Sequence, residues 1–257
     1  MEFLSWKVDE GVAVVTINRP PANALARQLI VELDGILDEI AKEPAARVVL
    51  LHGEGRFFSA GADIKEFTNV QTGEEFSRLA ENGQNVFEKV ETFEKPVIAA
   101  IHGAALGGGL ELAMACHMRF VTETAKLGLP ELQLGLIPGF AGTQRLPRYV
   151  GVAKAAEMMF TSEPISGVEA VQWGLANRAY TEEELLPQSL QTAKAIAKKS
   201  PVALKAAIHM LQYAKPSTYY EGLKAEAESF GTVFVSEDAK EGISAFIEKR
   251  QPVFQGK

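Results

Sequence analysis

Two glutamates, Glu111 and Glu131, stand in apolar sequence twenty residues apart, and each adjoins a segment rich in glycine. Glu111 lies in the apolar run 110–116, where a buried carboxylate is costly unless it is paired, hydrogen-bonded or protonated. The glycines at 107–109 precede this run and predict a helix whose first backbone N–H groups suit an anion or a polarised oxygen. Two carboxyl groups beside such donors predict paired acid–base chemistry on a substrate that develops oxyanion character.

The same residue types also fit a purely structural explanation. A glutamate in the first turn of a helix interacts favourably with the helix dipole, which would account for Glu111. Glu131 would then cap a helix of its own. The pattern around the two glutamates leaves both explanations open.

The elements that must position these glutamates alternate between strands and helices. Apolar runs at 12–17, 48–51 and 97–101 predict buried strands. Apolar residues at helical spacing predict helices over 25–40 and 76–93, between those strands. Asn23 is expected to cap the first of these helices. This alternation predicts a layered α/β fold.

The second half of the chain has mainly helical patterns, over 150–160, 166–173 and 182–199. The second of these opens with a capping box from Ser166 to Glu169 and closes at Gly174. Ser200 and Pro201 predict a boundary, after which only helical patterns follow. We expect a core over residues 1–199 and a helical module over 200–257 whose apolar faces need a partner surface, which subunit association would supply.

Bulk properties narrow the class of protein further. A chain of 257 residues with 47% hydrophobic and 23% charged residues fits one large globular core. A net charge of −7 argues against nucleic acid as the main partner, and no apolar run is long enough to span a bilayer. The N-terminal residues lack the pattern of a secretory signal or transit peptide, and the single cysteine, Cys116, fits a reducing cytoplasm. The four histidines have no metal-ligand spacing, so we expect no metal.

Several nucleotide-binding and hydrolase motifs are excluded. A dinucleotide-binding G-x-G-x-x-G motif fails because Leu112 stands where the third glycine belongs, and no glycine is followed by the Lys-Ser or Lys-Thr of a P-loop. Ser59 lies in a segment that lacks the first glycine of a nucleophile elbow. A serine hydrolase is therefore disfavoured.

Five blocks of sequence, in order, resemble the crotonase (enoyl-CoA hydratase/isomerase) family, and within it the enoyl-CoA hydratases of fatty-acid β-oxidation. They are residues 18–25 (NRPPANAL), 58–63 (FSAGAD), 103–111 (GAALGGGLE), 130–146 and 241–250. The similarity spans essentially the whole chain. It implies an α/β fold with a crotonase-like β/α spiral core and a C-terminal helical module. It also implies a homo-oligomer, either a trimer or a dimer of trimers.

The resemblance also implies an activity and roles for individual residues. The activity is addition of water to C3 and a proton to C2 of a trans-2-enoyl-CoA thioester, with no cofactor, because CoA is part of the substrate. Glu111 would hold and deprotonate the water, and Glu131 would supply the C2 proton. Backbone N–H groups of Ala62 and Gly108 would form the oxyanion hole for the thioester carbonyl. CoA contacts would come from Ala60, Gly61, Ala62, Asp63, Ile64, Lys65 and Gly108, with further contacts from Ala24, Leu25 and Lys249.

Some positions depart from the family pattern, and other functions stay open. Phe140 and Ala141 replace a smaller pair before Gly142, which predicts a narrower acyl pocket, and His117 stands where many relatives carry an acid. A Δ3,Δ2-enoyl-CoA isomerase or another acyl-CoA lyase is the alternative within the fold. The presence of both glutamates favours hydration, because an isomerase can shuttle a proton with one carboxylate. A non-catalytic CoA- or RNA-binding member is the alternative outside catalysis, and the acidic charge disfavours RNA. Lys249 also fits an ordinary surface charge.

Overall fold

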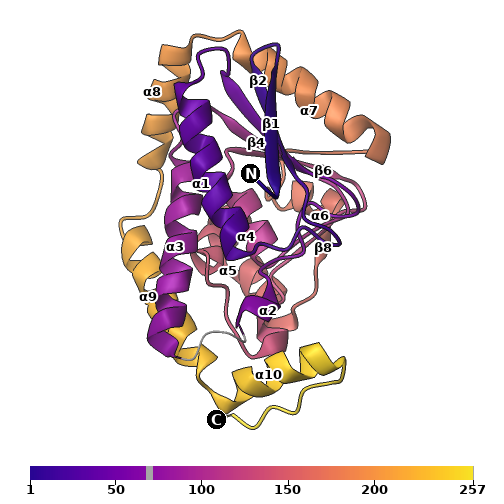
Figure 1. Ribbon diagram of the computed structural model, residues 1–257, viewed down its shortest axis with the longest axis vertical. Coiled ribbons are helices and arrows are strands. Elements are labelled where there is room, and N and C mark those ends of the chain that lie inside the picture. The colour runs from indigo at the N-terminus through magenta and orange to yellow at the C-terminus, as the bar shows by residue number, and fades with distance from the viewer. Residues whose placement is uncertain (68–71, 257) are drawn as a thin grey trace.

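A computed structural model describes residues 1–67 and 72–256 of the chain (Figure 1). Its frame is a six-stranded sheet with the strands in the order β1 (Leu4–Asp9), β2 (Val12–Ile17), β3 (Val48–Gly53), β4 (Val97–Ile101), β6 (Met118–Thr122) and β9 (Arg178–Tyr180). A second sheet contains β5 (Ala104–Leu106), β7 (Lys126–Gly128) and β8 (Ile165–Ser166). The strand predictions for β2, β3 and β4 are confirmed.

Helices connect these strands and cover both faces of the larger sheet. They are α1 (Arg27–Lys42), α2 (Ile64–Phe67), α3 (Gly73–Glu91), α4 (Gly108–Ala115), the 3-10 helix η1 (Glu131–Leu134), α5 (Gly142–Thr161), α6 (Gly167–Gln172) and α7 (Glu182–Ala197). The C-terminal helices are α8 (Pro201–Gln212), α9 (Tyr219–Phe234) and α10 (Glu237–Glu248). Within the described residues, no helix combines the length and the apolar character that a membrane span requires.

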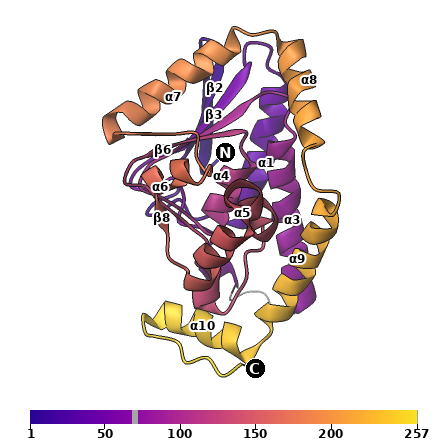
Figure 2. The ribbon, with the colours of Figure 1, turned by 180° about the vertical axis from the view of Figure 1, so that it is seen from behind.

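The larger sheet is parallel from β2 onward, and only β1 pairs antiparallel with its neighbour. Parallel neighbours need crossover connections, and α1 and α3 provide the first two. Successive strand residues face opposite ways, so Val49 and Leu51 pack in the core that includes α1, whereas Val48 and Leu50 pack with Leu185 of α7. Figures 1 and 2 show α1 and α3 on one side of the strands and α7 on the other.

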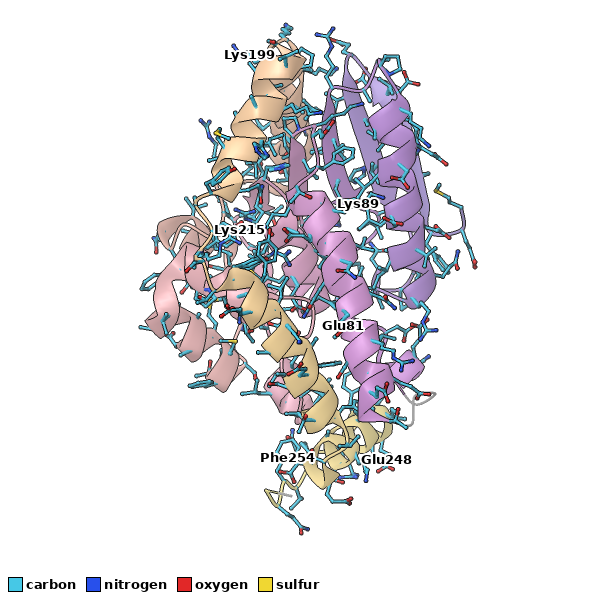
Figure 3. The ribbon with its side chains drawn as sticks, turned by 90° about the vertical axis from the view of Figure 1, so that its left-hand side faces the viewer. Glu81, Lys89, Lys199, Lys215, Glu248 and Phe254 are labelled. Carbon is cyan, nitrogen blue, oxygen red and sulfur yellow. The ribbon has the colours of Figure 1, made fainter. Side chains whose placement is uncertain are left out.

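Helix α9 packs along α3 within the same chain (Figure 3). A Cβ at Gly73 would lie 2.6 Å from the carbonyl oxygen of Gly231, so the two backbones approach closely there. Phe76 of α3 packs against Phe230 of α9, with ring centroids 5.9 Å apart. The apolar face of α9 is therefore covered by α3, whereas Leu211 on α8 stays 65% exposed.

The prediction that Asn23 caps α1 is wrong. Ala26 occupies the N-cap of this helix and makes no side-chain cap bond. Asn23 instead accepts a hydrogen bond from the Arg19 N–H at 2.8 Å and donates to the carbonyl oxygens of Glu54 and Phe57. Its short polar side chain thus binds two loops together, and long-range partners win over the local cap.

Two helix boundaries also differ from the predicted ranges. Leu25 precedes α1 and forms a parallel β-bridge with Ala62, so the helix starts later than its apolar spacing suggests. Helix α5 begins at Gly142, eight residues before the predicted start at Val150, because its first turn is anchored by distant carboxylates described below. The capping box of Ser166 and Glu169 is confirmed.

Candidate active site

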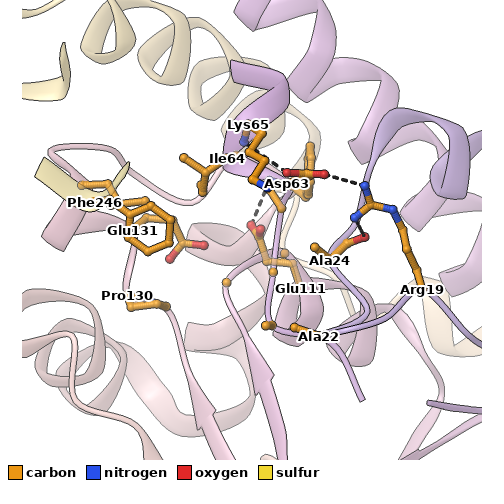
Figure 4. Close-up of a pocket in the computed structure, with 18 of the residues that line it drawn as sticks. Arg19, Ala22, Ala24, Asp63, Ile64, Lys65, Glu111, Pro130, Glu131 and Phe246 are labelled. Atoms are coloured by element: carbon orange, nitrogen blue, oxygen red, sulfur yellow. Dashed lines mark hydrogen bonds and ion pairs between the residues drawn. The ribbon is translucent and has the colours of Figure 1, made fainter. Parts of the chain in front are cut away.

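A pocket of about 990 Å³ opens where the loops after β2 and β3 meet the start of α4 (Figure 4). The residues predicted as catalytic or oxyanion-hole groups and the main predicted CoA contacts, from Ala60 to Lys65 together with Gly108, Glu111 and Glu131, line it. Ala24 and Phe140 line it as well, and α10 contributes Phe246. Leu25 lines a neighbouring cavity instead. The sequence therefore predicted residues that the fold brings together from distant segments.

Glu111 enters the pocket from α4, which starts where the chain turns at Gly107 with a φ of +50°. The side chain is 1% exposed. Its Oε1 accepts hydrogen bonds from the backbone N–H groups of Phe140 at 2.8 Å and Gly142 at 2.7 Å. The carboxylate is therefore held by main-chain donors through one oxygen, which leaves Oε2 for a further partner.

Glu131 enters from η1, and its Oε2 is buried without a hydrogen-bond partner among the residues that the structure describes. A Cβ at Gly107 would lie 2.8 Å from Glu131 Oε1, so the carboxyl group sits directly against the turn that starts α4. A buried polar atom without a partner costs about 1–3 kcal/mol. Such an atom in a pocket is suited to meet a ligand group.

The pKa values of both glutamates are raised, chiefly by burial. Burial raises the pKa of Glu131 to about 8, and the negative charge of Glu226 adds to this. Burial also raises the pKa of Glu111 well above its usual value, and the charges of Glu131 and Glu226 add to it, while the Gly142 and Phe140 N–H groups oppose the rise. Ionisation of both carboxyl groups at once is therefore disfavoured near neutral pH.

The backbone around Ala62 leaves one N–H group pointing away from its strand partner. The Leu25 N–H donates to the Gly61 carbonyl at 2.7 Å, and the Asp63 N–H donates to the Leu25 carbonyl at 3.2 Å. Since successive N–H groups of extended chain point to opposite sides, the Ala62 N–H faces away from Leu25. Gly108 opens α4, where N–H groups lack intrahelical partners.

The two segments that carry these N–H groups lie in contact. A Cβ at Gly61 would stand 3.7 Å from Gly108 N and 2.9 Å from the Leu106 carbonyl oxygen. Ser59 fixes this arrangement, because its N–H donates to the Ala104 carbonyl at 3.1 Å and its carbonyl accepts from the Leu106 N–H at 3.1 Å. Small residues in both segments permit this close approach.

An ion pair ties the predicted CoA-binding loop to the loop after β2. Arg19 Nη2 lies 2.6 Å from Asp63 Oδ2, and Arg19 Nη1 donates to the Ala24 carbonyl at 3.1 Å (Figure 4). The Asp63 side chain therefore holds in place a loop whose residues line the pocket.

Two residues singled out in the sequence lie outside the pocket. His117 accepts a hydrogen bond at Nδ1 from the Val97 N–H at 2.8 Å, and burial lowers its pKa to about 4, so it serves as a neutral link in the packing. Lys249 ends α10 in a left-handed conformation and is not among the described residues that line the pocket.

Glu226 of α9 was not predicted as part of the site. Its side chain is 4% exposed and contacts the segment that holds Glu111. The available signal was its position on the apolar face of α9, between Leu223 and Phe230. An acid on a buried helix face indicates a specific partner.

Comparison with known proteins gives matches along the whole chain. The sequence profile of the family described as enoyl-CoA hydratase/isomerase matches residues 7–257. A Bacillus subtilis (strain 168) protein named "Probable enoyl-CoA hydratase" is 56% identical over 257 residues, 100% of both chains. The "Crotonyl-CoA hydratase" of Syntrophomonas wolfei is 41% identical over 260 residues, covering 100% of this chain and 99% of the relative. A solved structure of an enoyl-CoA hydratase/isomerase from Xanthobacter autotrophicus Py2 superposes with a TM-score of 0.88 at 26% identity, covering 97% of each chain.

The parallel core, the pocket at its loops and the C-terminal helices define a protein of the crotonase fold class. The chain belongs to the enoyl-CoA hydratase/isomerase family. The resemblance drawn from five sequence blocks and the predicted fold class are thereby confirmed.

Proposed function

We propose that this protein is an enoyl-CoA hydratase that adds water across the 2,3 double bond of trans-2-enoyl-CoA thioesters, and that Glu111 and Glu131 are its catalytic carboxyl groups. The observation that carries the proposal is one pocket into which two carboxyl groups project, that of the buried Glu111 and that of Glu131, whose Oε2 is buried. The names of two full-length relatives, "Probable enoyl-CoA hydratase" and "Crotonyl-CoA hydratase", support the same reaction.

The hydrogen bonds of the two glutamates suggest different roles for them. Burial raises the pKa of Glu111, but its two N–H bonds oppose that rise and stabilise the ionised form, so we assign Glu111 as the base that binds a water through Oε2. Glu131, with a pKa of about 8, is protonated at pH 7 and acts as the acid. The water oxygen bonds to C3 as its proton passes to Glu111, and the Glu131 proton passes to C2. One proton then returns from Glu111 to Glu131 through solvent, which restores the starting state.

Negative charge develops on the thioester oxygen in the transition state of this addition, and the enzyme must stabilise it. We assign the oxyanion hole to the backbone N–H groups of Ala62 and Gly108. The contact between their segments and the direction of the Ala62 N–H support this assignment. Loss of one such donor in an enzyme typically costs about 2.7–4 kcal/mol of transition-state stabilisation.

The remaining features of the proposal concern substrate, assembly and location. The backbone of residues 60–65 and Gly108 binds the CoA part of the substrate, and no separate cofactor takes part. We propose a homo-oligomer, a trimer or a dimer of trimers, in which exposed apolar residues of α8 such as Met210 and Leu211 are covered. We place the protein in the cytoplasm and in fatty-acid β-oxidation. Its net charge of −7 supports an absence of nucleic-acid partners.

A product assay tests the reaction class. Purified protein is given crotonyl-CoA and, separately, a 3-enoyl-CoA, and the products are separated by chromatography. A hydratase forms 3-hydroxybutyryl-CoA from crotonyl-CoA and leaves the 3-enoyl-CoA largely unchanged. Conversion of the 3-enoyl-CoA at the higher kcat/KM would favour the isomerase alternative. Binding of acyl-CoA without turnover of either substrate would reject catalysis.

A further inference from the structure

A buried glutamate outside the proposed catalytic pair holds the same loop as Glu111. The 140–143 loop comprises the last two residues before α5 and the first two residues of that helix, and its four consecutive N–H groups alternate between two carboxylates. Phe140 and Gly142 donate to Glu111, whereas Ala141 and Thr143 donate to Glu226. The loop is therefore held by hydrogen bonds to two different carboxylates.

Both carboxylate oxygens of Glu226 accept hydrogen bonds. Its Oε1 accepts from the Ala141 N–H and from Gln84 Nε2 at 3.2 Å. Its Oε2 accepts from the Thr143 N–H at 2.9 Å and from the Thr143 hydroxyl. Burial raises the pKa of Glu226, and these hydrogen bonds together with the charge of Arg145 oppose that rise, so they favour its ionised form.

The backbone of the loop needs such a partner. Ala141 has a φ of +73°, a left-handed conformation that costs a residue with a Cβ about 1–3 kcal/mol unless its surroundings hold it. Its N–H and that of Thr143 would be buried donors without acceptors if the Glu226 carboxylate were removed. The loop would then relax, and Glu111 would lose the two N–H groups that orient it.

We propose that Glu226, supplied by the C-terminal helix α9, is a positioning residue that fixes the Glu111 carboxylate by clamping the 140–143 loop from the opposite side. This inference rests on the proposed function. It gives the C-terminal helices a part in the active site of their own chain, because α9 contacts both α3 and the loop that holds Glu111.

The charge of Glu226 has a second consequence for the site. The negative charge of Glu226 raises the pKa values of both Glu111 and Glu131, and the charge of Arg145 in α5 lowers that of Glu226. Arg145 has other hydrogen-bond partners, because it donates to Glu91 at 2.8 Å and to the Phe140 carbonyl at 3.0 Å. Removing the negative charge of Glu226 should therefore lower the pKa values of both proposed catalytic carboxyl groups.

The test compares Glu226→Gln with Glu228→Gln, an exposed glutamate on the same helix, in crotonyl-CoA hydration by the full-length protein. We expect kcat of Glu226→Gln to fall at least tenfold with KM within twofold of the unchanged protein. Both limbs of its pH–rate profile should shift to lower pH, and Glu228→Gln should match the unchanged protein. Thr143→Val, which removes one donor and keeps the charge, should lower kcat severalfold without moving the pH profile.

The outcomes separate this inference from the proposed function. If the unchanged protein does not hydrate crotonyl-CoA, the hydratase proposal is refuted. If the unchanged protein is active and folded Glu226→Gln has the same kcat and pH profile, only the positioning role is refuted. If Glu226→Gln fails to fold by circular dichroism, Thr143→Val decides, and an unchanged kcat in that variant overturns the inference.

Discussion

Replacing Phe140 with alanine should lengthen the acyl chain that the protein accepts. The Phe140 side chain is 5% exposed, and Phe140 lines both the candidate active-site pocket and a second cavity of about 740 Å³. Its ring stands edge-on to Phe87 at 5.4 Å between centroids, and a Cβ at Gly83 would lie 2.4 Å from it. The ring thus fills the space between the two cavities, and its removal would join them.

The size of the effect follows from the apolar area that a longer chain would bury. Each buried methylene contributes about 0.8 kcal/mol, so an eight-carbon chain gains about 3 kcal/mol over a four-carbon chain, equivalent to a factor of about 100 or more. The second cavity also carries charged residues, which limits the gain to about tenfold to 100-fold. They are Arg27, Asp34, Glu66, Glu75 and Arg78.

The assay is the ratio of kcat/KM for trans-2-octenoyl-CoA to that for crotonyl-CoA. Phe140→Ala should also lose about 3–5 kcal/mol of stability, as large-to-small core changes do, so a stability-matched control is needed. Phe120→Ala provides it, because Phe120 is 1% exposed and packs on the α7 side of the sheet. A folded Phe140→Ala protein with the same ratio as Phe120→Ala would refute the reasoning.

Three further outcomes are expected. First, kcat/KM should fall about tenfold per pH unit above pH 8 as Glu131, with a pKa of about 8, loses its proton; a pH–rate profile that is flat to pH 10 would contradict this role. Second, Gly107→Ala should lower kcat at least tenfold and destabilise the fold by about 1–3 kcal/mol, because the new Cβ would lie 2.8 Å from Glu131 Oε1 at a φ of +50°; urea unfolding and steady-state kinetics measure both, and wild-type values for the two would exclude the clash. Third, acid should remove a stabilising ion-pair cluster. Burial opposes ionisation of Glu91, but the charges of Arg145 and Lys215 outweigh it and lower its pKa from 4.5 to about 2. A carboxylate whose pKa is lower in the folded state stabilises that state at pH values above its unfolded-state pKa. About 3 kcal/mol of the free energy of unfolding should therefore be lost as the pH falls from about 4.5 to about 2. The free energy of unfolding of Glu91→Gln, measured by urea titration, should decrease less over this pH range than that of the unchanged protein. The same decrease in both proteins would contradict the role of Glu91.

The sequence predicted the strands β2, β3 and β4 at the centre of the layered α/β fold, because fully buried strands leave a clear apolar pattern. The run over β2 starts after Gly11 and is apolar except for Thr16, and the run over β4 starts after Pro96 and is apolar throughout, so their bounds were predicted to the residue. The edge strand β1 was not predicted, since its alternating exposed side chains in LSWKVD leave no such run. Helix content after residue 200 was also predicted, because amphipathic spacing is local information.

The predictions that failed concern contacts between distant segments. Asn23 has the residue type and position of a helix cap, but acceptors more than thirty residues away take its amide. The start of α5 depends on Glu111 and Glu226, which lie 31 and 83 residues from the N–H groups that they hold. No local pattern encodes such pairings. The catalytic roles of Glu111 and Glu131 and the oxyanion role of Ala62 and Gly108 stay predictions that kinetics must test.

The most direct test of the proposed mechanism is the turnover of crotonyl-CoA by Glu111→Gln, by Glu131→Gln and by the double variant. General acid and base groups typically contribute factors of about 10² to 10⁴ each. If the two carboxyl groups act on one substrate, each single variant should lose at least about 10²-fold in kcat while remaining folded. The double variant should lose far less than the product of the two, because the groups act as a unit. Retention of more than a tenth of the original kcat by either single variant would contradict the mechanism.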